Sequence, residues 1–449
     1  MKRALLALTV AGALFVAPRA AEANGRFPES NQLFFAPGDD QRLIVRTTFG
    51  LLFSQDRGAS WHWVCDQAIP LSGAEDPMIA MTPNGNTLAT TFQGLAMSKS
   101  KGCDWSNIAG DLDKQVFIDL AANPSDPKHV VVFASSYDHQ DADGGIFFLS
   151  KLWETKDEGE TYTVLGPALD PSLLGYTVDL TKSDPDRVYV TAVRNPGVGT
   201  SAFFLASKDH GKTWTETPIP LEDTERAIFI AAVDATDANK VYVRTSNGTD
   251  KPSRLLYTED GGATWKMIYK AQGPLLGFAL ASDGSKVYVG GPKDGIRVAS
   301  TTDFTFAQKS NIETQCLALA SDGLWACSNE KSGFIIALSK DEGATFEKET
   351  HFCDIEGALE CPAGTKTNTE CVSRWPVQKA LLGCGGLPDG GSADGGSSSG
   401  GSPAGDDGRV DPGGGCDCRM TRTSPFAAFA SAGLAAAAIA IVMRRARRR

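Results

Sequence analysis

A near-identical octet recurs along the chain and constrains its fold more than any other feature. The best copies read SQDRGASW, TKDEGETY, SKDHGKTW, TEDGGATW and SKDEGATF, and they begin at Ser54, Thr155, Ser207, Thr258 and Ser339. Weaker copies begin at Ser98 (SKSKGCDW) and Ser300 (STTDFTF), so that successive octets begin 39 to 57 residues apart. A repeat of this period is typical of architectures in which each copy builds one unit of supersecondary structure.

The segments between the octets share one order of β-rich runs and turns. One unit reads YTVDLTKSDPDRVYVTAV, a loop, AFFLASKDHGKTW and TETPI, which predicts strands at 176–180, 188–193 and 202–207 and a fourth strand after Trp214. Helical periodicity is nearly absent from residues 26–350. Seven units of four antiparallel strands predict an all-β fold, a seven-bladed β-propeller that occupies residues 24–350.

Each residue type of the octet suits a tight turn. The Asp carboxylate can accept hydrogen bonds from turn amides, and the Gly supplies a backbone conformation that other residues avoid. We expect the aromatic residue to pack where two blades meet, and the octet to join the third and fourth strands of its blade. The residues with this structural role are Asp56, Gly58, Trp61, Asp157, Gly159, Asp209, Gly211, Trp214, Asp260, Gly262, Trp265, Asp341 and Gly343.

The octet resembles the Asp-box, or BNR, repeat of sialidases, sortilin-type receptors, oligoxyloglucan hydrolases and photosystem assembly factors. The resemblance spans about residues 30–350 and implies the propeller fold. It implies no activity, because enzymes and binding proteins share the box. The chain lacks the Arg-Ile-Pro motif that opens a sialidase propeller, and no carboxylate pair outside the octets stands out as a glycosidase pair.

Both ends of the chain carry features of an exported and anchored protein. Residues 1–23 combine Lys2 and Arg3, an apolar run and the sequence AEA, which predicts a secretory signal peptide and the use of the export machinery. Residues 385–415 are rich in Gly, Ser and Asp, as flexible linkers are. Residues 424–443 are apolar, uncharged and long enough for a transmembrane helix, and the basic tail RRARRR follows them.

The segment 416–449 resembles the MYXO-CTERM sorting signal of myxobacterial surface proteins, because GGGCDCRMTR precedes the apolar segment and the basic tail. The resemblance implies that a sorting protease cleaves near these cysteines and that Cys416 or Cys418 is lipid-anchored. The alternative is that the helix remains as a permanent anchor. Both interpretations place the domain outside the inner membrane. We expect a protein anchored at the bacterial cell surface, at the outer membrane, with membrane contact through the C-terminal anchor only.

The charge of the body argues against nucleic acid as a partner. The net charge of the chain is −11, of which the signal peptide contributes +2 and the tail from Arg419 contributes +7, so residues 24–418 carry −20. An acidic body of this size repels both phosphate backbones and anionic lipid headgroups.

The cysteines predict disulfides, because the chain is exported and holds ten of them. Cys316 and Cys327 flank a turn symmetrically and are expected to pair across two strands of the last blade, and Cys65 and Cys103 are expected to bridge the first two blades. Residues 351–384 form a small module with a short helix near 377–382. Its cysteines are Cys353, Cys361, Cys371 and Cys384, which allow three connectivities. We predict no metal and no cofactor, since the cysteine spacings are too wide for structural zinc.

Functional residues are expected on the propeller face opposite the octets. Arg46, Arg194 and Arg244 end the second strand of three blades, and their guanidinium groups could converge on an anionic ligand. Tyr137, Asp138 and His139 lie in a long acidic loop of the third blade. The sequence favours a non-catalytic module that binds a protein or polysaccharide of the envelope or extracellular matrix. The alternatives are a glycoside hydrolase, sialidase-like or glucan-cleaving, and a scaffold whose Cys-rich module recognises the ligand.

Overall fold

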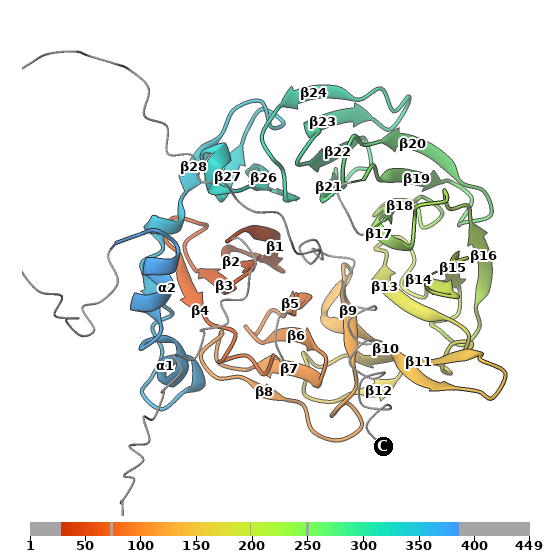
Figure 1. The fold of residues 1–449 in the computed structure, drawn as a ribbon, viewed down its shortest axis with the longest axis horizontal. Helices are drawn as coiled ribbons and strands as arrows, with labels where there is room; N and C mark the ends of the chain where they lie inside the picture. Colours follow the sequence, from red (N-terminus) through yellow and green to blue (C-terminus); the bar gives the residue numbers. More distant parts are fainter. Residues whose placement is uncertain (1–27, 72–74, 198, 248–250, 386–449) are drawn as a thin grey trace, which may run out of the picture.

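Seven antiparallel sheets surround a central axis (Figure 1). The structure is a computed structural model that describes residues 28–71, 75–197, 199–247 and 251–385. Each sheet contains four consecutive antiparallel strands, and one sheet has a fifth strand from the C-terminal region, so the predicted all-β, seven-bladed propeller is confirmed. The expected signal peptide, almost all of the linker, and the segment 416–449 with Cys416, Cys418 and the apolar stretch lie outside the described residues.

The strands follow the chain blade by blade, from the axis outward. Blades 1 to 3 contain β1 (Ser30–Ala36), β2 (Asp39–Thr47), β3 (Gly50–Ser54), β4 (His62–Val64), β5 (Ile79–Met81), β6 (Thr87–Thr91), β7 (Gly94–Ser98), β8 (Ser106–Asn107), β9 (Phe117–Asn123), β10 (Asp126–Gln140), β11 (Ile146–Thr155) and β12 (Thr163–Val164). Blades 4 and 5 contain β13 (Leu174–Leu180), β14 (Val188–Arg194), β15 (Ser201–Ser207), β16 (Thr215–Ile219), β17 (Ala227–Val233), β18 (Val241–Ser246), β19 (Arg254–Thr258) and β20 (Lys266–Lys270). Blades 6 and 7 contain β21 (Gly277–Leu280), β22 (Lys286–Gly291), β23 (Gly295–Ser300), β24 (Ala307–Ser310), β25 (Cys316–Ala320), β26 (Gly323–Cys327), the 3-10 helix η1 (Glu330–Ser332), β27 (Ile336–Ser339) and β28 (Glu347–Thr350).

The sequence of each strand reflects its distance from the axis. The second strand of blade 1 buries Leu43, Ile44 and Val45 completely, because adjacent blades cover both of its faces. Outer strands such as β16 (TETPI) and β20 (KMIYK) are largely polar and border solvent. The innermost strands of adjacent blades contact one another and line the axis. The core therefore consists of apolar layers between blades.

The ring closes between blade 7 and blade 1 without exchange of a strand. Inner strand β1 contacts β25, and Ser30 donates hydrogen bonds to the backbone carbonyls of Ser328 (3.1 Å) and Ile335. Arg57 of blade 1 forms an ion pair with Asp322 of blade 7 (2.7 Å). Side chains thus provide the contacts that a shared strand would otherwise supply.

A C-terminal module, residues 351–384, packs on the outer edge of blade 1 (Figure 1). It contains the 3-10 helix η2 (Phe352–Asp354), β29 (Gly357–Ala358), α1 (Lys366–Cys371) and α2 (Trp375–Leu381). β29 pairs with β4 in parallel and becomes the fifth strand of that sheet. The ring of Trp375 lies 5.6 Å from the ring of Trp63.

The disulfides correct part of the expected pairing. Cys316 pairs with Cys327 across β25 and β26, and Cys353 pairs with Cys384 within the module. The expected bridge between Cys65 and Cys103 is wrong, because these residues pair with Cys371 and Cys361 of the module. The physical reason is the docking of the module: Thr367 of α1 donates hydrogen bonds to the carbonyls of Gly102 (2.7 Å) and Cys103 (3.0 Å), which brings module cysteines against blades 1 and 2.

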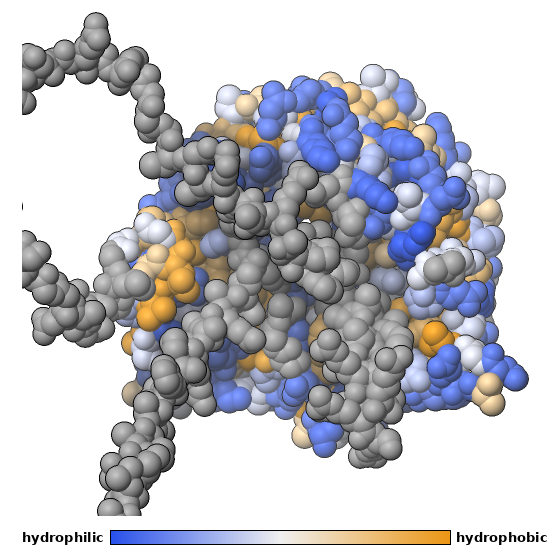
Figure 2. Space-filling model, in the orientation of Figure 1, coloured by the Kyte–Doolittle hydropathy of each residue, from blue (hydrophilic) through white to orange (hydrophobic). Residues whose placement is uncertain are grey.

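The visible surface is mostly hydrophilic, with a hydrophobic patch over the C-terminal module (Figure 2). The exposed apolar residues of that module are Val372, Val377 and Leu381. Within the described ranges, no helix is long and apolar enough to cross a membrane.

Candidate functional site

The octets close the turn between the third and fourth strands of their blades. In the octet of blade 4, Asp209 Oδ1 accepts hydrogen bonds from the Ser207 hydroxyl (2.8 Å) and the Thr213 amide (2.9 Å). Asp209 Oδ2 accepts from the Thr213 hydroxyl (2.6 Å), and the Gly211 amide donates to Ser207 Oγ (2.8 Å). The same bonds recur around Asp56, Asp157, Asp260 and Asp341.

These bonds fix the charge state of the octet aspartates. Hydrogen bonds from the Thr213 hydroxyl and amide and from Ser207 lower the pKa of Asp209 to about 2. The equivalent donors lower the pKa of Asp260 and Asp341 to about 2 as well. The octet carboxylates are therefore ionised acceptors engaged by their own turns, which is a structural role.

The glycine and the aromatic residue of the octet contact the preceding blade. Gly262 has a φ of 97°, and a Cβ there would lie 2.4 Å from Cδ1 of Phe204 in blade 4. Only glycine satisfies both the positive φ and the close approach. Trp265 packs edge-on against the same Phe204 ring, with centroids 5.2 Å apart. The other octet glycines also contact the blade before them: Gly58 faces Trp325, Gly159 faces Met97, Gly211 faces Leu165 and Gly343 faces Ile296.

The residue between the Asp and the Gly also reaches the preceding blade. It has a positive φ in the good octets, for example 57° at His210. Its side chain forms a contact with that blade, as in Glu158 with the Asn84 amide (2.7 Å), His210 with Glu154 (2.8 Å) and Glu342 with Lys309 (2.7 Å). The octet therefore closes its own hairpin and joins two blades.

Two of the three predicted arginines, Arg46 and Arg244, lie at the end of the propeller opposite the octets. Arg46 ends β2 and donates hydrogen bonds to Asn31 Oδ1 (2.8 Å) and to the carbonyls of Asp76 and Pro77 (3.2 Å each). Arg244 on β18 donates to the Leu275 carbonyl (2.9 Å) and lies over the ring of Phe229. Burial, together with the positive charge of Arg46, lowers the pKa of Arg244 to about 10.

The third arginine does not join them. Arg194 extends toward the outer strand of its blade, where it forms a bidentate ion pair with Glu216 and donates a hydrogen bond to the Ser172 hydroxyl (2.7 Å). Its guanidinium also lies 4.3 Å from the centre of the Phe203 ring. Arg194 is therefore engaged within its own blade.

Tyr137, Asp138 and His139 lie on a strand, where the sequence analysis expects a loop. β10 and β11 form a long hairpin that projects from the ring (Figure 1), and the Asp141 carboxylate at its tip accepts the Gly145 amide (2.6 Å). His139 stacks on Phe147 (4.8 Å) and contacts Asp138 (2.9 Å). The segment is a strand because β10 and β11 continue to pair as far as Gln140 and Ile146, beyond the length of the strands in the other blades.

Two carboxyl groups near the axis were missed by the sequence analysis. Asp119 on β9 is 6% exposed and accepts a hydrogen bond from the Val178 amide of blade 4 (2.8 Å). Burial raises the pKa of Asp119 to about 8 and that of Asp179, on β13, to about 7. The signal was available, since each is the acidic residue of an otherwise mostly apolar inner strand, in FIDLAAN and YTVDL.

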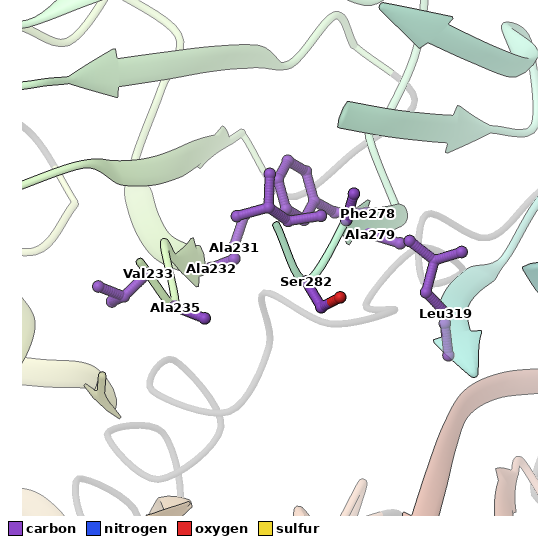
Figure 3. A pocket seen from close by; sticks show the side chains of 11 residues that line it. Ala231, Ala232, Val233, Ala235, Phe278, Ala279, Ser282 and Leu319 are labelled. Atoms are coloured by element: carbon purple, nitrogen blue, oxygen red, sulfur yellow. The ribbon is translucent and has the colours of Figure 1, made fainter. Parts of the chain in front are cut away.

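A hollow of about 290 Å³, lined mostly by apolar side chains, lies along the inner strands of blades 5 to 7 (Figure 3). Val233, Phe278 and Leu319 line it, and Ser282 supplies the one side-chain hydroxyl among its lining residues. Some residues of the hollow belong to the turns between the first and second strands of their blades. In an antiparallel blade these turns lie at the same end as the octets, which join the third and fourth strands. The hollow is therefore on the octet side and holds no titratable group.

Comparisons with known proteins identify the fold class. No family model matches the chain, and no curated protein matches it. Among solved structures, an ancestral GH74 enzyme is similar, with 12% identity and a TM-score of 0.50 over 71% of this chain and 46% of that one. Hydrazine synthase of Kuenenia stuttgartiensis has 10% identity and a TM-score of 0.50 over 72% of this chain and 98% of that one. The chain thus spans less than half the length of the GH74 enzyme, and identities this low show the propeller fold alone.

Proposed function

We propose that the chain is an exported, surface-anchored β-propeller that binds an envelope or extracellular protein or polysaccharide without catalysis. The proposed ligand is anionic, and it binds at the axis on the face opposite the octets. The observation that carries this proposal is that Arg46 and Arg244, from blades 1 and 5, lie at the same end of the propeller, opposite the octets, where the charge of Arg46 contributes to the lowered pKa of Arg244.

The local charge balance supports an anionic ligand. Asp119, with a pKa of about 8, is mostly protonated at pH 7, and Asp179, with a pKa of about 7, is about half protonated. The two arginines keep their charge. A carboxylate or sulfate placed between them would relieve their mutual repulsion, and guanidinium groups bind such anions with charge-assisted hydrogen bonds.

The second candidate is a glycoside hydrolase, which the two raised carboxyl pKa values near the axis favour. Such enzymes need one protonated and one ionised carboxyl group flanking the scissile bond. The environment of Asp119 favours the binding proposal instead, because Asp119 is nearly inaccessible and accepts the Val178 amide, which ties blade 3 to blade 4.

The test is a panel of uronic-acid polymers, sulfated polymers, neutral glucans and acidic peptides, with retention on the protein and release of new reducing ends measured together. Binding of an acidic polymer without release is the expected result. Arg244→Gln should weaken that binding at least 10-fold. The matched control Arg194→Gln changes an arginine at the same strand position whose partner is Glu216, and it should leave binding unchanged. Release of reducing ends that Asp119→Asn abolishes would contradict the proposal and establish the hydrolase.

A further inference from the structure

Three side chains that can ligate metal ions meet at the boundary between blades 3 and 4, on the octet side. His129 lies at the start of β10, Glu154 is the residue before the blade 3 octet, and His210 follows Asp209 in the blade 4 octet. Their ligand atoms all lie within 4.8 Å of one another. The group uses two of the five histidines of the chain.

Both histidines present Nε2 to the same carboxylate oxygen. Glu154 Oε2 lies 2.9 Å from His129 Nε2 and 2.8 Å from His210 Nε2. The other oxygen, Oε1, lies 3.0 Å from Lys156 Nζ. A carboxylate oxygen therefore lies between two imidazole rings at the boundary of the two blades.

The histidine nitrogens are not satisfied by this arrangement. His129 is 4% exposed, and its Nε2, despite its proximity to Oε2, is not aligned for a hydrogen bond and has no other partner within the described part of the chain. A buried ring nitrogen without a hydrogen bond is unfavourable, and a bound ion would satisfy it. His210 is partly open to solvent, with 22% of its side chain exposed, so an ion and one water molecule can enter from that side.

We propose that His129, Glu154 and His210 form a site for a divalent transition-metal ion of the zinc type. Two imidazole nitrogens and one carboxylate oxygen are a ligand set typical of zinc, with a fourth position open to water. Tetrahedral coordination at 2.0–2.2 Å places ligand atoms about 3.4 Å apart. The nitrogen–oxygen distances must therefore open by about half an ångström, which the long side chain of Glu154 and the surface turn that carries His210 allow.

Asn123 sets the affinity of the site. Its Oδ1 accepts the Ser125 amide (2.8 Å), which leaves its Nδ2 facing His129 Nδ1 (3.0 Å). The metal-free ring therefore accepts at Nδ1 and carries its hydrogen on Nε2. A metal on Nε2 moves that hydrogen to Nδ1, where an acceptor is needed. Asparagine must then turn its amide, so the native site is weaker than one with aspartate at this position.

The test is Co²⁺ titration of the purified, tag-free protein, followed by visible absorption and by equilibrium dialysis with Zn²⁺. One equivalent should bind with the intense visible band of four-coordinate cobalt. His129→Gln and His210→Asn should each weaken binding at least 30-fold, and asparagine tolerates the positive φ at 210. Asn123→Asp should tighten binding at least 10-fold. Misfolding cannot explain such a gain, because a misfolded variant would bind metal more weakly.

His139→Gln is the matched control, because His139 also contacts a carboxylate, that of Asp138, but is exposed on the β10–β11 hairpin. It should leave the titration unchanged, and circular dichroism checks the fold of each variant. Absence of saturable binding up to millimolar metal overturns the proposal. Binding that His210→Asn leaves intact, or an Asn123→Asp affinity equal to that of the native protein, overturns it as well.

Discussion

Replacing Cys65 and Cys371 by serine removes one of the two disulfides that join the C-terminal module to the propeller. The remaining bridge, Cys103–Cys361, still closes most of the unfolded chain. The loop that opens therefore comprises only residues 65–103 and 361–371, about 48 residues, which corresponds to about 4 kcal/mol of chain entropy at 25 °C. Replacing Cys103 and Cys361 too opens a second loop, whose ends are 258 residues apart. The combined loss of free energy of unfolding is about 10 kcal/mol, which is comparable to the total stability of a typical domain.

Urea unfolding at 25 °C, followed by tryptophan fluorescence, measures these losses. Serine at 65 and 371 should lower the free energy of unfolding by about 4 kcal/mol, and the fourfold variant should be largely unfolded or unfold at low urea. The control replaces Cys316 and Cys327, which are 11 residues apart in one hairpin, and should cost about 3 kcal/mol. A fourfold variant no less stable than this control would refute the argument that the two long-range disulfides of the module stabilise the propeller.

Three further predictions concern the blade contacts. Ser207→Ala should lower the free energy of unfolding by about 1–3 kcal/mol, because the buried Gly211 amide loses its acceptor. The control Ser201→Ala, at the exposed start of the same strand, should change the free energy of unfolding by less than about 0.5 kcal/mol. Equal effects of the two substitutions would contradict the role of the octet. Gly175→Ala should cost at least about 1–3 kcal/mol, since its Cβ would lie 2.1 Å from Phe133 Cζ, whereas Gly357, whose nearest neighbour is 3.9 Å away, should tolerate alanine in the same urea assay. The pKa of Asp119, about 8 in the folded protein against 3.8 ordinarily, means that the folded state binds this proton more tightly, so stability falls as pH rises from about 4 to about 8. The contribution of Asp119 to the free energy of unfolding should be about 2–3 kcal/mol larger at pH 6 than at pH 9. Asp119→Asn, which keeps an acceptor for the Val178 amide, should remove that difference. A pH profile that this substitution leaves unchanged would show that the carboxyl group is not buried as described.

The parts of the fold that local sequence determines were predictable, and the parts that depend on docking were not. The octet bonds around Asp209 connect residues no more than four positions apart, so residue types alone indicated them. The pairing of Cys65 and Cys103 depends on where α1 packs, and no local pattern encodes that contact.

The candidate site divides in the same way. Arg46 and Arg244 lie near the ends of β2 and β18, on the face opposite the octets, and their convergence on a ligand stays a prediction. Arg194 occupies the same kind of position, yet it forms an ion pair with Glu216 on β16, two strands away in the same blade. His129, Glu154 and His210 are far apart in the chain, and only the packing of blade 4 on blade 3 brings them together.

The central claim is that recognition occurs at the axis on the face opposite the octets. Hydrogen–deuterium exchange with and without a bound acidic polymer tests this claim most directly. We predict slower exchange on binding in residues 44–49 and 241–247, which include the ends of β2 and β18 near Arg46 and Arg244, and no change in the octet turns 54–61 and 207–214. Protection of the octet turns, with the ends of β2 and β18 unaffected, would contradict the account.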